Sequence, residues 1–89
     1  MKFNYPTRSN CIRYENRKSG HYKFYEIDLI PGPEDSHGRE TAAIRAKWGV
    51  IGTHNPHAEI KHKGTMEDCI KVMGTMIRKR LSRGYEKVP

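Results

Sequence analysis

The sequence of 89 residues has no long hydrophobic run and no export signal. A membrane-spanning helix needs about 20 predominantly apolar residues, and no stretch here approaches that length. The amino-terminal residues MKFNYPTRSN lack the apolar core of a secretory signal peptide. We therefore expect a soluble protein that does not associate with membranes and that remains in the cytoplasm.

Cysteine is also scarce. The two cysteines, Cys11 and Cys69, are too few for a disulfide framework, so we expect reduced thiols. His54, His57 and His62 lie close together in sequence, but no Cys-x-x-Cys pair accompanies them. This spacing favours loop and surface histidines over a metal site. Neither a metal nor another cofactor is predicted.

The motifs of common enzyme classes are absent. The chain has no glycine-rich nucleotide loop, no G-x-S-x-G elbow and no H-E-x-x-H helix. Cys69 falls on the apolar stripe of a predicted helix, where thiols are usually inert packing groups. Glu34 and Asp35 are neighbours in a segment rich in proline and glycine, where solvation is the ordinary explanation. We predict no catalytic residues and no enzymatic activity.

Positive charge is plentiful, and it gathers at the two ends of the chain. The net charge is +7, from 17 Lys and Arg against 10 Asp and Glu. Residues 1–25 and 71–87 each carry six basic side chains and one acidic one, whereas residues 26–70 carry five basic and eight acidic ones. If the ends fold side by side, they form a basic face, which is typical of polyanion binders. A solvated surface explains the composition equally well.

The pattern of apolar residues predicts one domain over residues 11–89, preceded by a flexible arm at residues 1–10. Alternation of apolar and polar side chains at every second position predicts strands. The clearest is KFYEIDLI, in which Tyr25, Ile27 and Leu29 share one face. The predicted strands cover residues 11–15, 23–30, 42–48 and 58–63.

A helix is predicted to begin after Gly64. Thr65 is a natural N-cap, Asp68 three positions later resembles a capping box, and Gly84 is expected to end the helix. Helical spacing places the apolar residues in one stripe. Its members are Met66, Cys69, Ile70, Met73, Met76, Ile77 and Leu81. The prediction is therefore an α+β domain, with an antiparallel sheet of about four strands and one long carboxyl-terminal helix covering its apolar face.

Three motifs in this order resemble the WGR domain, a family named for its Trp-Gly-Arg motif and known from poly(ADP-ribose) polymerases and small bacterial proteins. They are KFYEIDL (23–29), WGVIGT (48–53) and RLSRGYE (80–86). The resemblance covers residues 12–86. It implies a twisted antiparallel sheet with a helix packed against its concave face, which agrees with the pattern above.

The resemblance also implies nucleic-acid binding, and in the polymerases the recognition of DNA ends or breaks. Carried over, it assigns Trp48 to packing against a terminal nucleotide and places Gly52, Thr53 and His54 close to the DNA backbone. Val50 stands where the family has its motif Arg, which in the polymerases relays DNA binding to a catalytic region. The change is consistent with a stand-alone module, and equally with the loss of DNA binding.

The residues themselves support two interpretations of Trp48. Gly49 and Gly52 lack a Cβ atom and would clear an approach to the indole ring, on which a nucleotide could stack. Trp48 also continues the apolar stripe of the third strand, so it is equally an ordinary core residue. Basic side chains would hold phosphates. Arg45 and Lys47 flank Trp48 on the opposite strand face, Lys61 and Lys63 share one face of the fourth predicted strand, and Arg80 lies near the end of the predicted helix.

Together these features predict a monomeric, non-enzymatic module that binds DNA ends, nicks or junctions and serves in DNA repair. It would lie in the nucleoid of a bacterium or the nucleus of a eukaryote. The alternative is a protein–protein interaction module that retains the WGR fold without DNA binding and docks to a nuclease, helicase or modifying enzyme.

Overall fold

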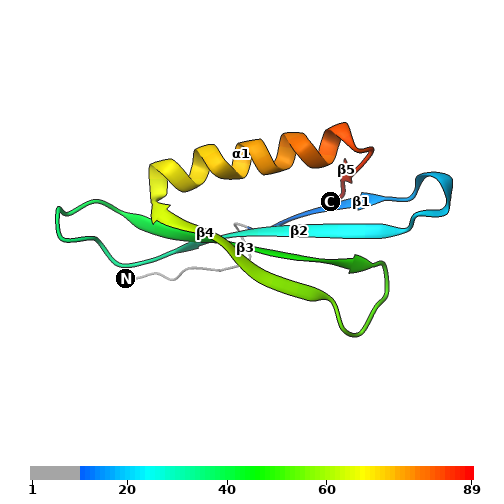
Figure 1. Ribbon diagram of the computed structural model, residues 1–89, viewed down its shortest axis with the longest axis horizontal. Coiled ribbons are helices and arrows are strands. Elements are labelled where there is room, and N and C mark those ends of the chain that lie inside the picture. The colour runs from blue at the N-terminus through cyan, green and yellow to red at the C-terminus, as the bar shows by residue number, and fades with distance from the viewer. Residues whose placement is uncertain (1–10) are drawn as a thin grey trace.

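One antiparallel sheet and one long helix make up the structure, a computed structural model that describes residues 11–89 (Figure 1). The arm predicted at residues 1–10 lies outside the described residues. The sheet has five strands in the order β4-β3-β2-β1-β5. The elements are β1 (Cys11–Asn16), the short 3-10 helix η2 (Lys18–Gly20), β2 (Lys23–Pro31), β3 (Thr41–Val50), β4 (His57–Thr65), α1 (Met66–Ser82) and β5 (Glu86–Lys87). The α+β prediction is confirmed.

The predicted strands all form, and each extends by one to three residues. The fifth strand, β5, is the element that the sequence pattern missed. It spans two residues and pairs with β1 through Tyr14 and Lys87 and through Glu15 and Glu86. So short a segment has no periodicity of its own, and only its contact with the other end of the chain makes it a strand.

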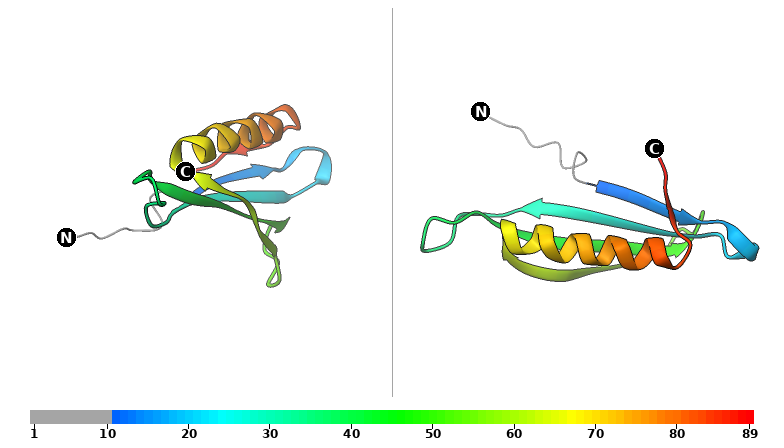
Figure 2. Two further views of the ribbon diagram at one scale, coloured as in Figure 1. Left: turned by 60° about the vertical axis from the view of Figure 1, so that its left-hand side comes forward. Right: turned by 90° about the horizontal axis from the view of Figure 1, so that it is seen from above.

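Figure 2 shows from two sides that α1 lies along one face of the sheet, and the core is packed between them. Ala42, Ile44 and Ala46 of β3 are buried against the helix, which contributes Cys69 and Met73. The Cys69 thiol donates a hydrogen bond to the carbonyl of Ala42 at 3.4 Å, and burial raises its pKa. The predicted packing role of this cysteine is therefore confirmed.

The helix begins where the sequence predicts. The Thr65 hydroxyl accepts a hydrogen bond from the Asp68 backbone N–H at 3.1 Å, which satisfies one of the free donors of the first turn. Ile70 and Leu81 belong to the predicted buried stripe but are exposed. They lie on the flank of the helix, and a helix resting on a sheet buries a narrower arc than the sequence stripe suggests. α1 is neither long nor apolar enough to span a membrane, and it is the only α-helix within residues 11–89.

A β-bulge in β4 changes which way its side chains point. Ile44 pairs with His62 but Arg45 pairs with Ile60, so Lys61 is the extra residue. Past the bulge, Lys63 pairs with Ala43 on the face away from the helix, whereas Lys61 points toward the helix side. The prediction that Lys61 and Lys63 share a face is therefore wrong.

Candidate nucleic-acid interface

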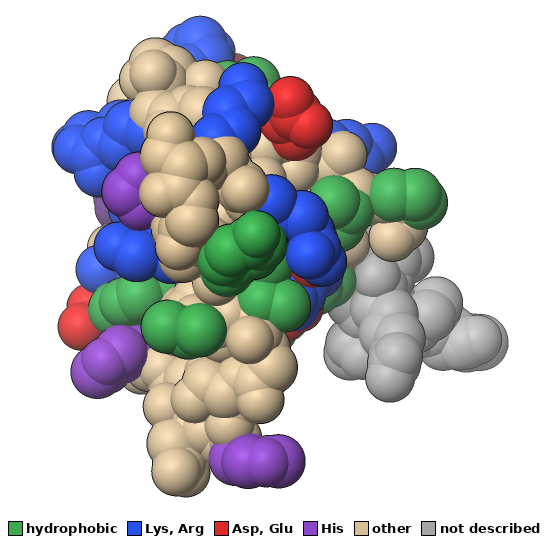
Figure 3. All heavy atoms as spheres, turned by 90° about the vertical axis from the view of Figure 1, so that its right-hand side faces the viewer, with side chains coloured by type: hydrophobic (Ala, Val, Ile, Leu, Met, Phe, Trp, Pro, Cys, Tyr) green, Lys and Arg blue, Asp and Glu red, His purple; other side chains and the backbone are tan. Residues whose placement is uncertain are grey.

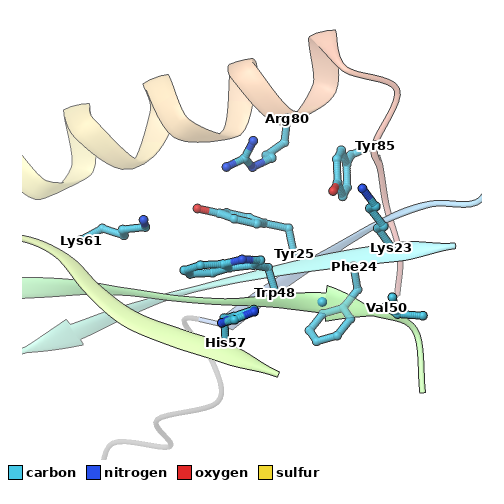
Figure 4. Close-up of a pocket in the computed structure, with 10 residues that line it drawn as sticks. Lys23, Phe24, Tyr25, Trp48, Val50, His57, Lys61, Arg80 and Tyr85 are labelled. Carbon is cyan, nitrogen blue, oxygen red and sulfur yellow. The ribbon is translucent and has the colours of Figure 1, made fainter. Parts of the chain in front are cut away.

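The strand register aligns three rings at one end of the sheet. Tyr25 of β2 pairs with Trp48 of β3, which pairs with His57 of β4. The ring centroids of Tyr25 and Trp48 are 6.1 Å apart with planes inclined by 26°, and those of Trp48 and His57 are 5.6 Å apart with planes inclined by 22°. These residues form an aromatic row. Arg80 of α1 continues it, since its guanidinium lies 4.0 Å from the Tyr25 ring centroid (Figure 4).

Trp48 lies inside this row and is half-buried. Tyr25 stacks against one side of the indole and His57 against the other, and the ammonium of Lys61 lies 4.8 Å from the ring centroid. A base could stack on the indole face only if His57 moved aside. The indole edge is open to the groove and offers an apolar surface to a sugar. Trp48 therefore packs on the core, as one of the two interpretations predicts, and it also lines a cavity.

A groove of about 500 Å³ opens beside the aromatic row, beneath the carboxyl-terminal end of α1. Lys23 and Val50, an adjacent cross-strand pair, line it on the same sheet face as Trp48, and Tyr85 lines it from the chain after the helix. Val50, at the position of the family's motif Arg, is 57% exposed. Figure 3 shows hydrophobic side chains at the middle of this end of the molecule, with Lys and Arg side chains around them.

The cations that line the groove differ in whether a carboxylate lies beside them. No carboxylate within residues 11–89 lies within ion-pair distance of Lys23 or Arg80, and the buried Nε of Arg80 has no hydrogen-bond acceptor there. Lys61 is 3.1 Å from a carboxylate oxygen of Glu59, an exposed pair of the kind that contributes little stability. The groove therefore presents positive charge that the protein itself leaves largely unneutralised.

The opposite sheet face carries cations that are paired. Arg45 lies 3.9 Å from the carboxylate of Asp28, and Lys47 lies 3.9 Å from that of Glu26. Arg13 donates to Glu26 at 2.7 Å and to Glu15 at 2.8 Å, and this second hydrogen bond lowers the pKa of Glu15. The predicted contacts from Arg45 and Lys47 would form on this face, away from Trp48. The Nε of Arg45 is buried without a hydrogen bond, but the Asp28 charge lies beside it.

The glycines around Trp48 have roles other than the predicted one. Gly49 faces away from the indole, and a Cβ there would lie 3.2 Å from Thr53 Cγ2 and 3.7 Å from the backbone of Pro56. Gly49 thus makes room for the β3–β4 loop. Gly52 has a φ of +91°, a turn conformation that favours glycine. Neither glycine clears an approach to the ring, so that part of the prediction is wrong.

The predicted site residues divide into three groups. Trp48, Lys61 and Arg80 meet at the groove. Gly52, Thr53 and His54 lie in the exposed β3–β4 loop at the same end of the molecule. The remaining three lie on the face away from the helix: Arg45, Lys47 and Lys63.

The sequence analysis did not assign several of the groove residues to the site. Among them are Lys23, Tyr25, His57 and Tyr85. The alternation of β2 does place Tyr25 on the apolar face. The pairing of His57 with Trp48 depends on how many residues the β3–β4 loop uses, and the sequence pattern does not reveal that number.

A twisted sheet with a helix on one face and a cationic, aromatic-lined groove is typical of a small nucleic-acid-binding domain. The family model of the WGR domain matches residues 9–89, so the chain belongs to the WGR domain family. This family is known for nucleic-acid binding. Searches of curated proteins and of solved structures gave no match to the chain. Within residues 11–89, no cluster of three or more His, Cys, Asp or Glu could hold a metal ion.

Proposed function

We propose that this WGR domain is a non-enzymatic module that binds DNA ends, nicks or junctions through the groove beneath α1. The observation that carries the proposal is the contrast between the two sheet faces. Lys23 and Arg80 line the groove without a carboxylate partner among the described residues, whereas Arg45 and Lys47 on the other face each lie beside one. A polyanion gains more from cations whose charge is not already neutralised.

Arg80 is the side chain best suited to hold a phosphate. Its guanidinium rests on the Tyr25 ring at 4.0 Å, which fixes the plane of the donor fork. Its Nε is buried without an acceptor, and a buried donor without a partner costs free energy that a phosphate oxygen would recover. Arginine also binds phosphate through two parallel hydrogen bonds, which a lysine cannot do.

The size of the groove favours a strand end over a continuous duplex. Its volume of about 500 Å³ lies within the range of small-ligand pockets, so it admits about one nucleotide. α1 closes it from above and the aromatic row lies below (Figure 4). A nucleotide enters such a space when its strand ends or is interrupted. A sugar would then lie against the edge of Trp48 while the phosphate meets Arg80 and Lys23.

Fluorescence anisotropy tests the proposal. A labelled DNA duplex with an open end is titrated with the protein beside a closed dumbbell of the same sequence, at a low and a higher salt concentration. We expect tighter binding to the open end and a steep decrease in affinity with salt. Equal affinity for both molecules would mean that the charge of +7 attracts DNA without a site for ends. No binding at low salt would refute the proposal and favour the interaction module.

A further inference from the structure

The aromatic row is closed at one end and open at the other. On the β2 side, the Arg80 guanidinium covers Tyr25. On the β4 side, the row ends at His57, whose side chain is exposed. Because β4 is the edge strand of the described sheet, no further strand lies beyond this imidazole. Among residues 11–89, one flat face of the exposed His57 ring is therefore left without a stacked ring, while the other rests on the indole.

We propose that a nucleobase stacks on the free face of His57 and so becomes the next ring of the row. The inference rests on the proposed function, since it concerns how this module holds a nucleic acid. It assigns the base-stacking role to His57 and leaves Trp48 as the support behind it. The occupant is an unpaired or terminal nucleotide, because a base inside a duplex already has both faces stacked.

The geometry of the row supplies the platform. Successive ring planes are inclined by only 26° and 22°, so the imidazole presents a face nearly parallel to the rings behind it. The register between Trp48 and His57 fixes the imidazole at the level of the indole. Stacking of a base on a flat side chain needs no particular base, because every base has a π-face.

Lys61 places a cation next to this platform. Its side chain lies on the same face of β4 as His57, with its ammonium 4.8 Å from the Trp48 ring centroid. Its partner Glu59 is exposed, so the pair between them is weak and a phosphate can replace the carboxylate. A base stacked on His57 and the phosphate of the same nucleotide near Lys61 would thus both be held by side chains of β4.

Three variants test the assignment in the full chain. His57→Ser removes the platform, and His57→Phe retains a flat ring in its place. His37→Ser is the matched control, because His37 is also exposed but lies in the β2–β3 loop and does not line the groove. The probe is an open-ended DNA duplex with 2-aminopurine at its terminal position, a base whose fluorescence falls when it stacks. Far-ultraviolet circular dichroism and thermal melting establish that each variant is folded.

We expect the wild-type protein, His57→Phe and His37→Ser to quench the terminal 2-aminopurine. We expect His57→Ser to leave it bright and to bind the open end about tenfold more weakly. If the wild type prefers the open end and His57→Ser matches it in affinity and quenching, the His57 assignment is overturned and the proposed function stands. An equal loss of affinity and quenching in His57→Phe also overturns the His57 assignment, since a flat ring at this position would then not be enough to stack a base. If the wild type shows no preference for the open end, the proposed function fails with it.

Discussion

Substitution of Lys23 and Arg80 by glutamine removes two positive charges from the groove and nearly conserves side-chain length. A hydrogen bond to a charged group contributes about 1.5–3 kcal/mol. Lys23 is exposed, and solvent weakens its contact with a phosphate. We therefore expect the two substitutions together to cost about 2–3 kcal/mol of binding free energy, which corresponds to a decrease in DNA affinity of about 30- to 150-fold. Each lost phosphate contact also reduces the slope of log affinity against log salt by about 0.9, or about 1.8 for both.

The assay is anisotropy of the labelled open-ended duplex over a series of salt concentrations. The matched control, Arg45→Gln with Lys47→Gln, removes the same charge from the opposite face, where the cations are paired with Asp28 and Glu26. We expect this control to lose much less affinity and to keep most of the salt slope. Thermal melting of both proteins separates a loss of binding from a loss of structure, because Arg80 also packs on a ring of the row.

Two results would refute the reasoning. If both double variants lose affinity equally, net charge alone attracts DNA and the unpaired cations of the groove have no special role. If the groove variant loses affinity while its salt slope stays unchanged, Lys23 and Arg80 do not contact phosphates. The second result would direct attention to the aromatic row as the principal contact.

Three further outcomes follow from local geometry. Gly49→Ala should lower the free energy of unfolding by about 1–3 kcal/mol in urea denaturation, because its Cβ would crowd Thr53 Cγ2 at 3.2 Å. Gly74→Ala should raise it by about 0.5–1 kcal/mol, since this glycine lies within α1 and a Cβ there meets only the end of an arginine side chain at 3.4 Å. Burial and a neighbouring carboxylate raise the pKa of the Cys11 thiol to about 11, so its alkylation rate, followed by mass spectrometry, should keep rising with pH to that value. A half-maximal rate near pH 9, the ordinary pKa of the thiol, would contradict this.

The sequence determined the elements whose causes are local. Alternation of side chains sets the strands, because successive residues of a strand point to opposite faces. Thr65 and Asp68 determine where α1 begins, since the cap needs only residues three positions apart. The three motifs placed the chain in the WGR family and contain Trp48 and Arg80 of the groove, and the basic residues of the predicted strands added Lys61.

Only the tertiary structure decided how these residues meet. The aromatic row depends on the register among β2, β3 and β4, which is set by hydrogen bonding between segments distant in sequence. The bulge at Lys61 reverses the alternation within one strand and separates Lys61 from Lys63. Carboxylates also lie beside Arg45 and Lys47 but not beside Lys23 and Arg80, and the charge count of the sequence does not reveal this difference. Each of these features depends on distances between residues far apart in the chain, which the local pattern of side chains does not encode.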